Sequence, residues 1–100
     1  MSEYDQEVED KVNNKLKHPQ MYKVMLLNDD FTPFEFVVHI LMKIFGKKQE
    51  VAESITMDIH NRNEGVCGVY SKDEAETYVA LVNRTSQENG FPLKAKMKKD

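Results

Sequence analysis

The sequence predicts an α+β domain, a two-layer sandwich of a three-stranded antiparallel sheet and three helices in the order βααβαβ. Residues 93–98 alternate apolar residues with lysines, which indicates a strand in a sheet with one buried and one solvated face. Helical spacing of apolar residues in three other segments supplies the second layer. A chain of 100 residues is the size of one such domain with a single core.

Residues 1–20 differ from the rest of the chain, because a cluster of acidic residues is followed by lysines and no apolar period is sustained. We expect residues 1–20 to form a disordered tail and residues 21–100 to form the folded domain, with Pro19 near the boundary. Residues 22–27 are a short apolar run rich in strand formers. This run predicts a buried strand that ends at the turn signal Asn28-Asp29-Asp30.

A start signal and apolar spacing predict two helices after this strand. Thr32-Pro33-Phe34-Glu35 has the form of a capping box with proline at the first helical position, so we expect a helix from Pro33 that is closed by Gly46. Most of its faces are apolar, which indicates that it is largely buried. Residues 49–61 carry apolar residues along one side at helical spacing and predict the second helix.

The second half of the chain predicts one helix between two strands. Residues 66–70 have the composition of a strand, and Ser71-Lys72-Asp73-Glu74 is another capping box. Apolar residues at helical spacing follow it, until Asn89-Gly90 breaks the helix before the last strand. The predicted core consists of apolar residues from all these elements: Val24, Leu26, Val37, Ile40, Leu41, Ile44, Phe45, Ile55, Ile59, Val66, Val69, Val79 and Val82.

Composition and charge narrow the classes of function. With 40% hydrophobic and 31% charged residues the chain is typical of a globular domain, and no run approaches the roughly 20 apolar residues of a membrane span. The start lacks the basic region of a signal peptide, so we expect a cytoplasmic protein. The 14 basic and 17 acidic residues argue against nucleic acid as the main partner. So small a domain leaves little room for a catalytic cavity, so we expect a binding module. We also expect no cofactor and no metal, and a monomer when the protein is free.

The sharpest cluster of polar residues is Asn28-Asp29-Asp30, with His60 available from the end of the second predicted helix. Adjacent carboxylates on a turn indicate a site, although turns also collect Asn and Asp for backbone reasons alone. A cysteine hydrolase with Cys67 as nucleophile and His60 as its base is another interpretation, but a thiol in a Val-Cys-Gly-Val strand is more often a small core residue. As the single cysteine, Cys67 can form no internal disulfide.

Two further interpretations have less support. A metal site would combine Asp29 or Asp30 with His60 and His39, but no paired ligand spacing supports it. Nucleic acid could contact the basic residues near the end of the chain, which are Lys94, Lys96, Lys98 and Lys99. Their alternation is typical of the solvated face of an edge strand, and no aromatic residues that could stack on bases interleave with them.

Several segments together closely resemble the ClpS adaptor family, from about residue 20 to the end of the chain. They are Tyr22-Lys23-Val24-Met25-Leu26-Leu27-Asn28-Asp29-Asp30-Phe31-Thr32-Pro33-Phe34-Glu35-Phe36-Val37, His60, Val66-Cys67-Gly68-Val69-Tyr70, Ala75-Glu76-Thr77 and Phe91-Pro92-Leu93. The resemblance implies a non-enzymatic adaptor that binds proteins with a bulky hydrophobic first residue (Phe, Tyr, Trp or Leu) through their free α-amine. Such an adaptor delivers these N-degron substrates to a Clp AAA+ unfoldase, of the ClpA or ClpC type, for degradation by the Clp protease.

The resemblance also implies the roles of individual residues. Asn28, Asp30 and His60 match the family's amine-binding residues, and they offer three acceptors for the three donors of an ammonium group. The first side chain of the substrate would enter a mostly apolar pocket, lined by Leu26, Leu27, Thr32, Pro33, Phe34, Val37, Thr56, Ile59 and Leu93. The surface that docks on the unfoldase would include Asp73 and Tyr78.

The chain departs from the family pattern at four positions. Phe34 and Thr56 stand where the family usually has methionine, so we expect an altered ranking of Phe, Tyr, Trp and Leu. Asn63 replaces a usual glycine, but asparagine also tolerates the left-handed conformation. Tyr78 replaces a usual lysine on the docking helix, which could change docking strength or partner.

An alternative from another class is a structural interaction domain of the same architecture, similar to the C-terminal domain of the ribosomal stalk protein. In such a domain Asn28-Asp29-Asp30 would be only a turn. It would have no reason to prefer a peptide with a free N-terminal phenylalanine.

Overall fold

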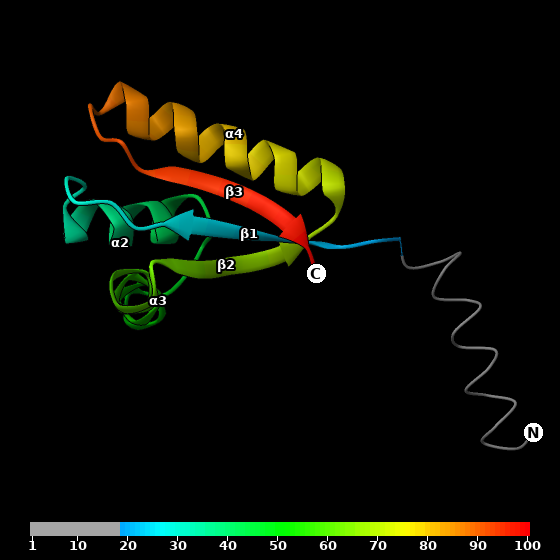
Figure 1. The fold of residues 1–100 in the computed structure, drawn as a ribbon, viewed down its shortest axis with the longest axis horizontal. Coiled ribbons are helices and arrows are strands. Elements are labelled where there is room, and N and C mark those ends of the chain that lie inside the picture. Colours follow the sequence, from blue (N-terminus) through cyan, green and yellow to red (C-terminus); the bar gives the residue numbers. More distant parts are fainter. Residues whose placement is uncertain (1–18) are drawn as a thin grey trace, which may run out of the picture.

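The computed structural model describes residues 19–100, so all but the last two residues of the predicted tail lie outside the described residues. The elements are β1 (Tyr22–Leu27), α2 (Phe34–Lys43), α3 (Gln49–Arg62), β2 (Glu64–Tyr70), α4 (Lys72–Glu88) and β3 (Lys94–Lys99). The predicted order βααβαβ is confirmed. The first strand is the central one, because the sheet order is β2-β1-β3 and both neighbours pair antiparallel to β1 (Figure 1).

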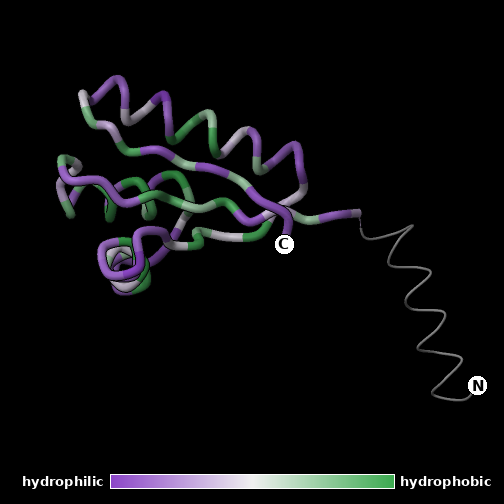
Figure 2. The backbone as a smooth tube through the Cα atoms, viewed as in Figure 1, coloured by the Kyte–Doolittle hydropathy of each residue, from purple (hydrophilic) through white to green (hydrophobic). Residues whose placement is uncertain are grey.

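The sheet has one covered and one open face. Along β3, Ala95 is buried whereas the flanking Lys94 and Lys96 are exposed, as the alternation predicts. The same alternation is visible as changing colour along the β3 tube in Figure 2. Apolar residues of all three helices form one core with the covered face of the sheet, and α3 lies beside the β2 edge (Figure 1). This is the predicted α+β fold. No helix within residues 19–100 is long and apolar enough to cross a membrane.

The core agrees with the prediction in the helices and in β1 but not in β2. Eight predicted core residues are buried: Val24, Leu26, Val37, Ile40, Leu41, Phe45, Ile59 and Val82. Another three, Ile44, Ile55 and Val79, are partly buried against that core. The prediction of Val66 and Val69 as core residues is wrong, since they are 42% and 43% exposed.

A β-bulge in β2 explains this error. Val24 pairs with Gly68 and the next residue, Met25, pairs with Val66, so Cys67 is the extra residue in the strand. Residues three apart cannot share a face of a regular strand, but the extra residue turns both valines toward the open face. The side chain that enters the core in their place is Cys67, which is 1% exposed.

A close approach of α3 to β2 fixes the end of α3. A Cβ atom added at Gly65 would lie 2.7 Å from the Ile59 side chain, so only glycine leaves room for the helix here. Asn63 closes α3 in the left-handed conformation with φ 72°, as expected of asparagine. Its carbonyl accepts a hydrogen bond of 2.8 Å from the Asn28 amide, which ties the end of β1 to the end of α3.

The two predicted capping boxes differ in the structure. At α4 the box is present: Ser71 Oγ accepts from the Glu74 amide at 3.3 Å, and the Ser71 amide donates to Glu74 Oε1 at 3.4 Å. At α2 the predicted box is wrong. The helix is capped by Pro33 without a side-chain hydrogen bond, and the Thr32 hydroxyl donates instead to Asp29 Oδ2 at 2.7 Å.

Candidate functional site

A hollow of about 500 Å³ lies where β1 ends and α2 begins. It is lined by polar residues of the turn after β1, by the first residue of α2 and by the last turns of α3: Asn28, Asp29, Asp30, Thr32, Phe34, Met57 and His60. The structure therefore brings the three predicted amine-binding residues, Asn28, Asp30 and His60, to one place. All three are exposed.

One backbone hydrogen bond sets the positions of Asn28 and His60 relative to each other. Asn28 directly follows β1, and its amide is bound to the Asn63 carbonyl at the end of α3. His60 lies one turn earlier in that helix, so the same hydrogen bond that fixes Asn28 also fixes its distance from His60. The site is thus assembled by the junction of β1 and α3, two elements separated in the sequence by α2.

The carboxylate of Asp29 is engaged within its own loop. Its Oδ1 accepts from the Phe31 amide at 2.8 Å and from the Thr32 amide at 2.7 Å, and its Oδ2 accepts from the Thr32 hydroxyl at 2.7 Å. Partial burial raises the pKa of this carboxyl, but the three hydrogen bonds outweigh burial and hold the pKa below its usual value. Asp29 therefore stays ionised at neutral pH.

The nine residues predicted for the side-chain pocket fall into two groups. Thr32 and Phe34 line the hollow, Pro33 is exposed and Leu27 is half-buried. The other five are buried in the domain: Leu26, Val37, Thr56, Ile59 and Leu93. The hydroxyl of Thr56 donates to the Ala52 carbonyl at 2.7 Å, so this residue presents its methyl group and not a free polar group to its surroundings.

Met57 also lines the hollow and was not predicted. It is 47% exposed, beside Phe34 at 43%. Residues three apart in a helix share a face, so the position of Met57, three before His60, could have indicated its place. Together Phe34 and Met57 give the hollow an apolar part.

The structure does not favour the hydrolase interpretation. Cys67 is buried and is not among the residues that line the hollow with His60. Burial raises the pKa of its thiol to about 12, although the positive charge of Lys47 and a hydrogen bond from the Leu26 backbone act in the opposite direction. A thiol that is protonated at neutral pH and hidden from solvent is a poor nucleophile.

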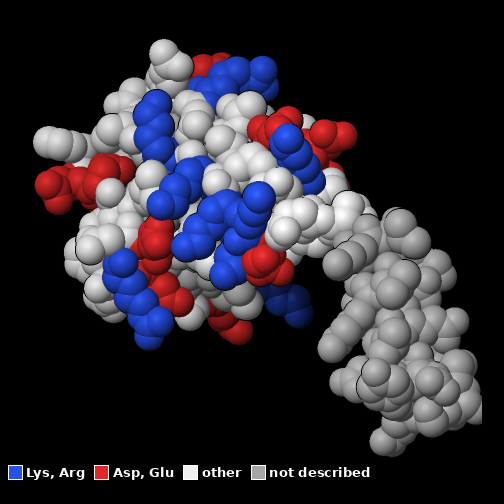
Figure 3. Space-filling model, turned by 45° about the vertical axis from the view of Figure 1, so that its right-hand side comes forward, with Lys and Arg blue, Asp and Glu red and all other residues white. Residues whose placement is uncertain are grey.

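Of the residues in the other two interpretations, His39 and the four lysines do not line the hollow, whereas Asp29, Asp30 and His60 do. His39 is exposed on α2, and no three His, Cys, Asp or Glu side chains within residues 19–100 come together as a metal site would require. On the open face of the sheet, Lys96 pairs with Glu64 at 3.2 Å and Lys23 with Asp100 at 3.9 Å. Figure 3 shows this mixture, with acidic groups beside the basic ones.

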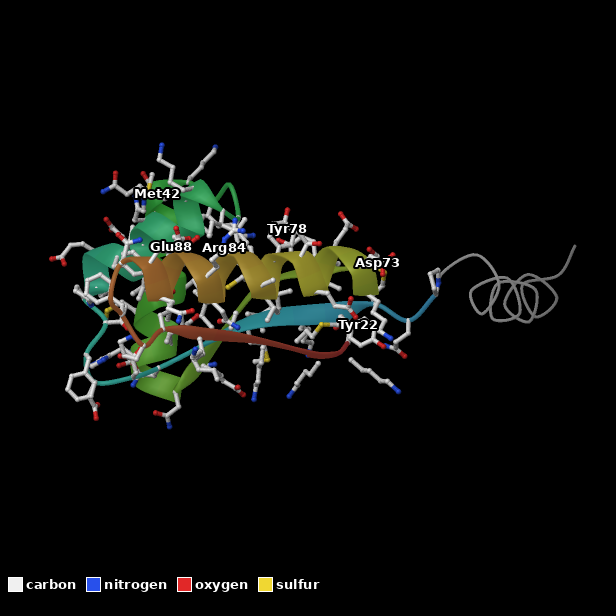
Figure 4. The ribbon with its side chains drawn as sticks, turned by 90° about the horizontal axis from the view of Figure 1, so that it is seen from above. Tyr22, Met42, Asp73, Tyr78, Arg84 and Glu88 are labelled. Carbon is white, nitrogen blue, oxygen red and sulfur yellow. The ribbon has the colours of Figure 1, made fainter. Side chains whose placement is uncertain are left out.

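A second hollow, of about 360 Å³, lies on α4. Its lining is acidic at one end and apolar at the other: Asp73, Glu74, Thr77, Tyr78 and Leu81. The predicted docking residues Asp73 and Tyr78 both belong to it, and Figure 4 shows them on the first half of the helix. The Tyr78 ring is held in place by Phe45 and Tyr70, at centroid distances of 5.1 and 4.4 Å.

The end of β1 and the start of α4 lie at opposite ends of the sheet (Figure 1). Asn28 follows Leu27, the last residue of β1, whereas α4 begins just after Tyr70, the partner of Tyr22 at the first residue of β1. Residue 20 lies at the end of the sheet where α4 begins, and its Gln side chain donates to the Asp100 carbonyl at 3.2 Å.

Comparison with known proteins gives a consistent result. Residues 17–96 match the family model described as "ATP-dependent Clp protease adaptor protein ClpS". An ATP-dependent Clp protease adapter protein ClpS from Methylococcus capsulatus is 57% identical over 79% of this chain and 74% of its own length. The protein of the same name from Enterobacter is 45% identical over 97% of this chain and 92% of its own length.

A solved structure has the same fold. The structure of Agrobacterium tumefaciens ClpS2 bound to L-phenylalaninamide superposes with a TM-score of 0.81 at 36% identity, and it covers 83% of this chain and 100% of its own.

Proposed function

The chain belongs to the ClpS family of ATP-dependent Clp protease adaptors, and from this premise we propose that it binds proteins with a bulky hydrophobic first residue through their free α-amine. The observation that carries the proposal is the hollow after β1, where Asn28, Asp30 and His60 meet. An α-ammonium has three donors, and these side chains offer an amide oxygen, a carboxylate and an imidazole nitrogen. A charge-assisted contact with Asp30 would be the strongest of the three.

The apolar part of the hollow suits the first side chain of such a substrate. Phe34 and Met57 are half-exposed next to the amine acceptors, so a Phe or Leu side chain entering between them would cover apolar surface on both. Burying such a side chain contributes about 1.5 to 3 kcal/mol. We infer that the buried residues of the predicted pocket, Leu26, Val37, Thr56, Ile59 and Leu93, form the deeper wall that this side chain reaches.

The ligand of the solved relative fits this chemistry. L-phenylalaninamide, bound by Agrobacterium tumefaciens ClpS2, carries a free α-amine and an aromatic side chain on one carbon atom. We infer that the substrates here have a first residue of the same kind: Phe, Tyr, Trp or Leu.

For delivery, we propose that the α4 hollow docks on a Clp AAA+ unfoldase of the ClpA or ClpC type, through Asp73 and Tyr78. Because the start of α4 and the end of β1 lie at opposite ends of the sheet, substrate and unfoldase can bind at the same time. We further propose that the protein acts in the cytoplasm as a monomeric adaptor and carries no catalytic residues.

Calorimetry with two peptides tests the peptide-binding proposal. A peptide with a free N-terminal phenylalanine should bind, and its N-acetylated form, which lacks the charge and donors of the amine, should not. A stalk-like interaction domain would bind neither, and equal binding of both peptides would refute recognition of the amine. Coprecipitation of the unfoldase with wild-type protein and with Tyr78→Ala tests docking separately.

A further inference from the structure

Two adjacent carboxylates line the peptide site, and the structure gives them different surroundings. All three hydrogen bonds to the Asp29 carboxylate come from its own loop, at 2.7 to 2.8 Å from Phe31 and Thr32. A carboxylate has about four lone-pair positions, so little acceptor capacity is left for a ligand. Both Asp29 and Thr32 are partly buried.

The neighbouring carboxylate is free of such contacts. Asp30 is exposed, and no hydrogen bond or ion pair among residues 19–100 involves its side chain. Asp30 lies between Asp29 and the two residues that donate to Asp29, so it lies inside the loop that these hydrogen bonds close. The direction of the Asp30 side chain therefore depends on the conformation of this loop.

We propose that Asp29 is a positioning residue of the amine site: it closes the 29–32 loop and so holds the Asp30 carboxylate toward the ligand amine, without binding the amine itself. The inference rests on the proposed function of this hollow. On the other side of Asp29, the bond from the Asn28 amide to the Asn63 carbonyl already fixes Asn28. The positions of Asn28 and Asp30 are thus held by two separate sets of hydrogen bonds.

The expected effect of removing the Asp29 hydrogen bonds follows from the populations of the loop conformations. Without Asp29 the loop samples several conformations, and only the fraction that holds Asp30 in place can bind. The apparent affinity falls by that fraction. If about 1 to 10% of the molecules keep the competent loop, Asp29→Ala weakens peptide binding about 10- to 100-fold.

The conservative variant separates positioning from charge. In Asp29→Asn the side-chain oxygen can still accept from the Phe31 and Thr32 amides, and the new NH₂ group can donate to the Thr32 hydroxyl. This variant should therefore bind the free-amine phenylalanine peptide within about threefold of the unmodified protein. Asp30→Asn keeps the shape but removes the charge that contacts the amine, so it should lose more than about tenfold.

The experiment is calorimetry of that peptide with Asp29→Ala, Asp29→Asn, Asp30→Asn and the control Asp58→Ala, which removes an exposed carboxylate of α3 outside the hollow. The proposal expects loss for Asp29→Ala, rescue for Asp29→Asn and no change for Asp58→Ala. If Asp29→Asn binds as weakly as Asp29→Ala, the charge of Asp29 acts on the amine directly and the proposal is overturned. If the unmodified protein fails to bind the peptide, the proposed function itself fails.

A double-mutant cycle gives a second readout. Because Asp29 acts through Asp30, adding Asp29→Ala to Asp30→Ala should weaken peptide affinity by less than about threefold further. If the two residues acted independently, their losses of binding free energy would add. NMR of the free protein should show the Phe31 and Thr32 amides shifted in Asp29→Ala but not in Asp29→Asn. If Asp29→Ala does not fold, Thr32→Val, which deletes one of the three hydrogen bonds, should still weaken binding, and unchanged affinity in that variant would overturn the proposal.

Discussion

The starts of α2 and α4 carry the same sequence pattern, a hydroxyl residue followed by glutamate three positions later, and they differ in structure. Ser71 and Glu74 cap α4 reciprocally, whereas Thr32 gives its hydroxyl to Asp29. The difference lies three residues before the hydroxyl residue. Asp29 holds this position before Thr32, whereas Gly68 holds it before Ser71 and has no side-chain acceptor. The Ser71 hydroxyl instead donates to Glu74 Oε1 at 2.9 Å, within its own capping box.

The two starts also serve different ends of the molecule. The α4 start stabilises a regular helix at the proposed docking end, and the α2 start closes the acidic loop at the proposed peptide end. The residues at the third position of each pattern follow this division, because Phe34 lines the peptide hollow and Asp73 lines the α4 hollow. If this division holds, a substitution at one end should leave binding at the other end unchanged.

The largest effect should come from the free carboxylate at the peptide end. Asp30→Ala leaves a bound ammonium without its charged partner, which costs about 2 to 5 kcal/mol, or tens to thousands of fold in affinity. Asp73→Ala, an exposed aspartate at the start of α4, should weaken only unfoldase docking. Calorimetry with the free-amine peptide measures the first effect and coprecipitation the second; loss of peptide binding in Asp73→Ala would show that the ends are coupled.

The next effect concerns selectivity. The Phe34 ring at the hollow should clash with a ligand whose first side chain branches at the β-carbon, so Val and Ile should bind worse than Leu by about 1 to 3 kcal/mol. Phe34→Ala should narrow this gap. Competition among three peptides that differ only in the first residue measures it, and equal affinity of Ile and Leu for the unmodified protein would show that Phe34 is not a gate.

Removing the cap of α4 should change stability and not peptide binding. Ser71→Ala loses a side-chain cap, which typically costs about 1 kcal/mol of unfolding free energy. Urea unfolding with fluorescence of the tyrosines, together with peptide calorimetry, reports both quantities. At the other helix Glu35→Gln should change stability by less than about 0.5 kcal/mol, because α2 has no side-chain cap to lose. A larger loss in Glu35→Gln than in Ser71→Ala would reverse the comparison.

Lowering the pH should change the loop before α2, because it protonates the Asp29 carboxylate. Burial raises the pKa of this carboxyl but the hydrogen bonds lower it more, so the folded-state pKa lies below the unfolded value of about 3.9. A depressed pKa contributes stability that is complete above the unfolded value and is lost as the pH falls through the folded one. The Phe31 and Thr32 amide signals should therefore stay constant from pH 7 to about pH 4 and move below it. In Asp29→Asn this movement should be absent.

The smallest effect on peptide affinity should come from deleting residues 1–17. The chain enters the domain beside Asp100, at the end of the sheet away from the peptide hollow, so affinity should not change. By family resemblance the segment should assist delivery, and degradation of a model substrate in a reconstituted Clp system should slow. Unimpaired degradation would assign this segment no part in delivery.

Local patterns predicted most of the fold. The bounds of β1 and the order of all elements follow from strand-forming residues, helical spacing and turn signals, each of which acts within a few residues. Local patterns failed in β2, because the bulge that turns Val66 and Val69 outward depends on how β2 pairs with β1. They failed at Thr32 for a related reason, since an upstream carboxylate decides what its hydroxyl binds.

The site was predicted through family resemblance more than through local physics. Asn28, Asp30 and His60 do meet in one hollow, but they do so through the contact between β1 and the end of α3, which no spacing in the sequence encodes. The separate surroundings of Asp29 and Asp30 could not be predicted either, because two adjacent aspartates look equivalent until the loop is closed. Met57 was not predicted, although it lies about one helical turn before His60 and therefore on the same face of α3.

The central place of β1 has a consequence for biosynthesis. Its partners β2 and β3 both follow it in the sequence, so β1 leaves the ribosome before either strand with which it pairs. At about 5 to 20 residues per second, the chain between Leu27 and Lys94 takes several seconds to make. During that time β1 lacks at least one of its two neighbouring strands, and the nascent domain exposes a strand that chaperones or other nascent chains can bind.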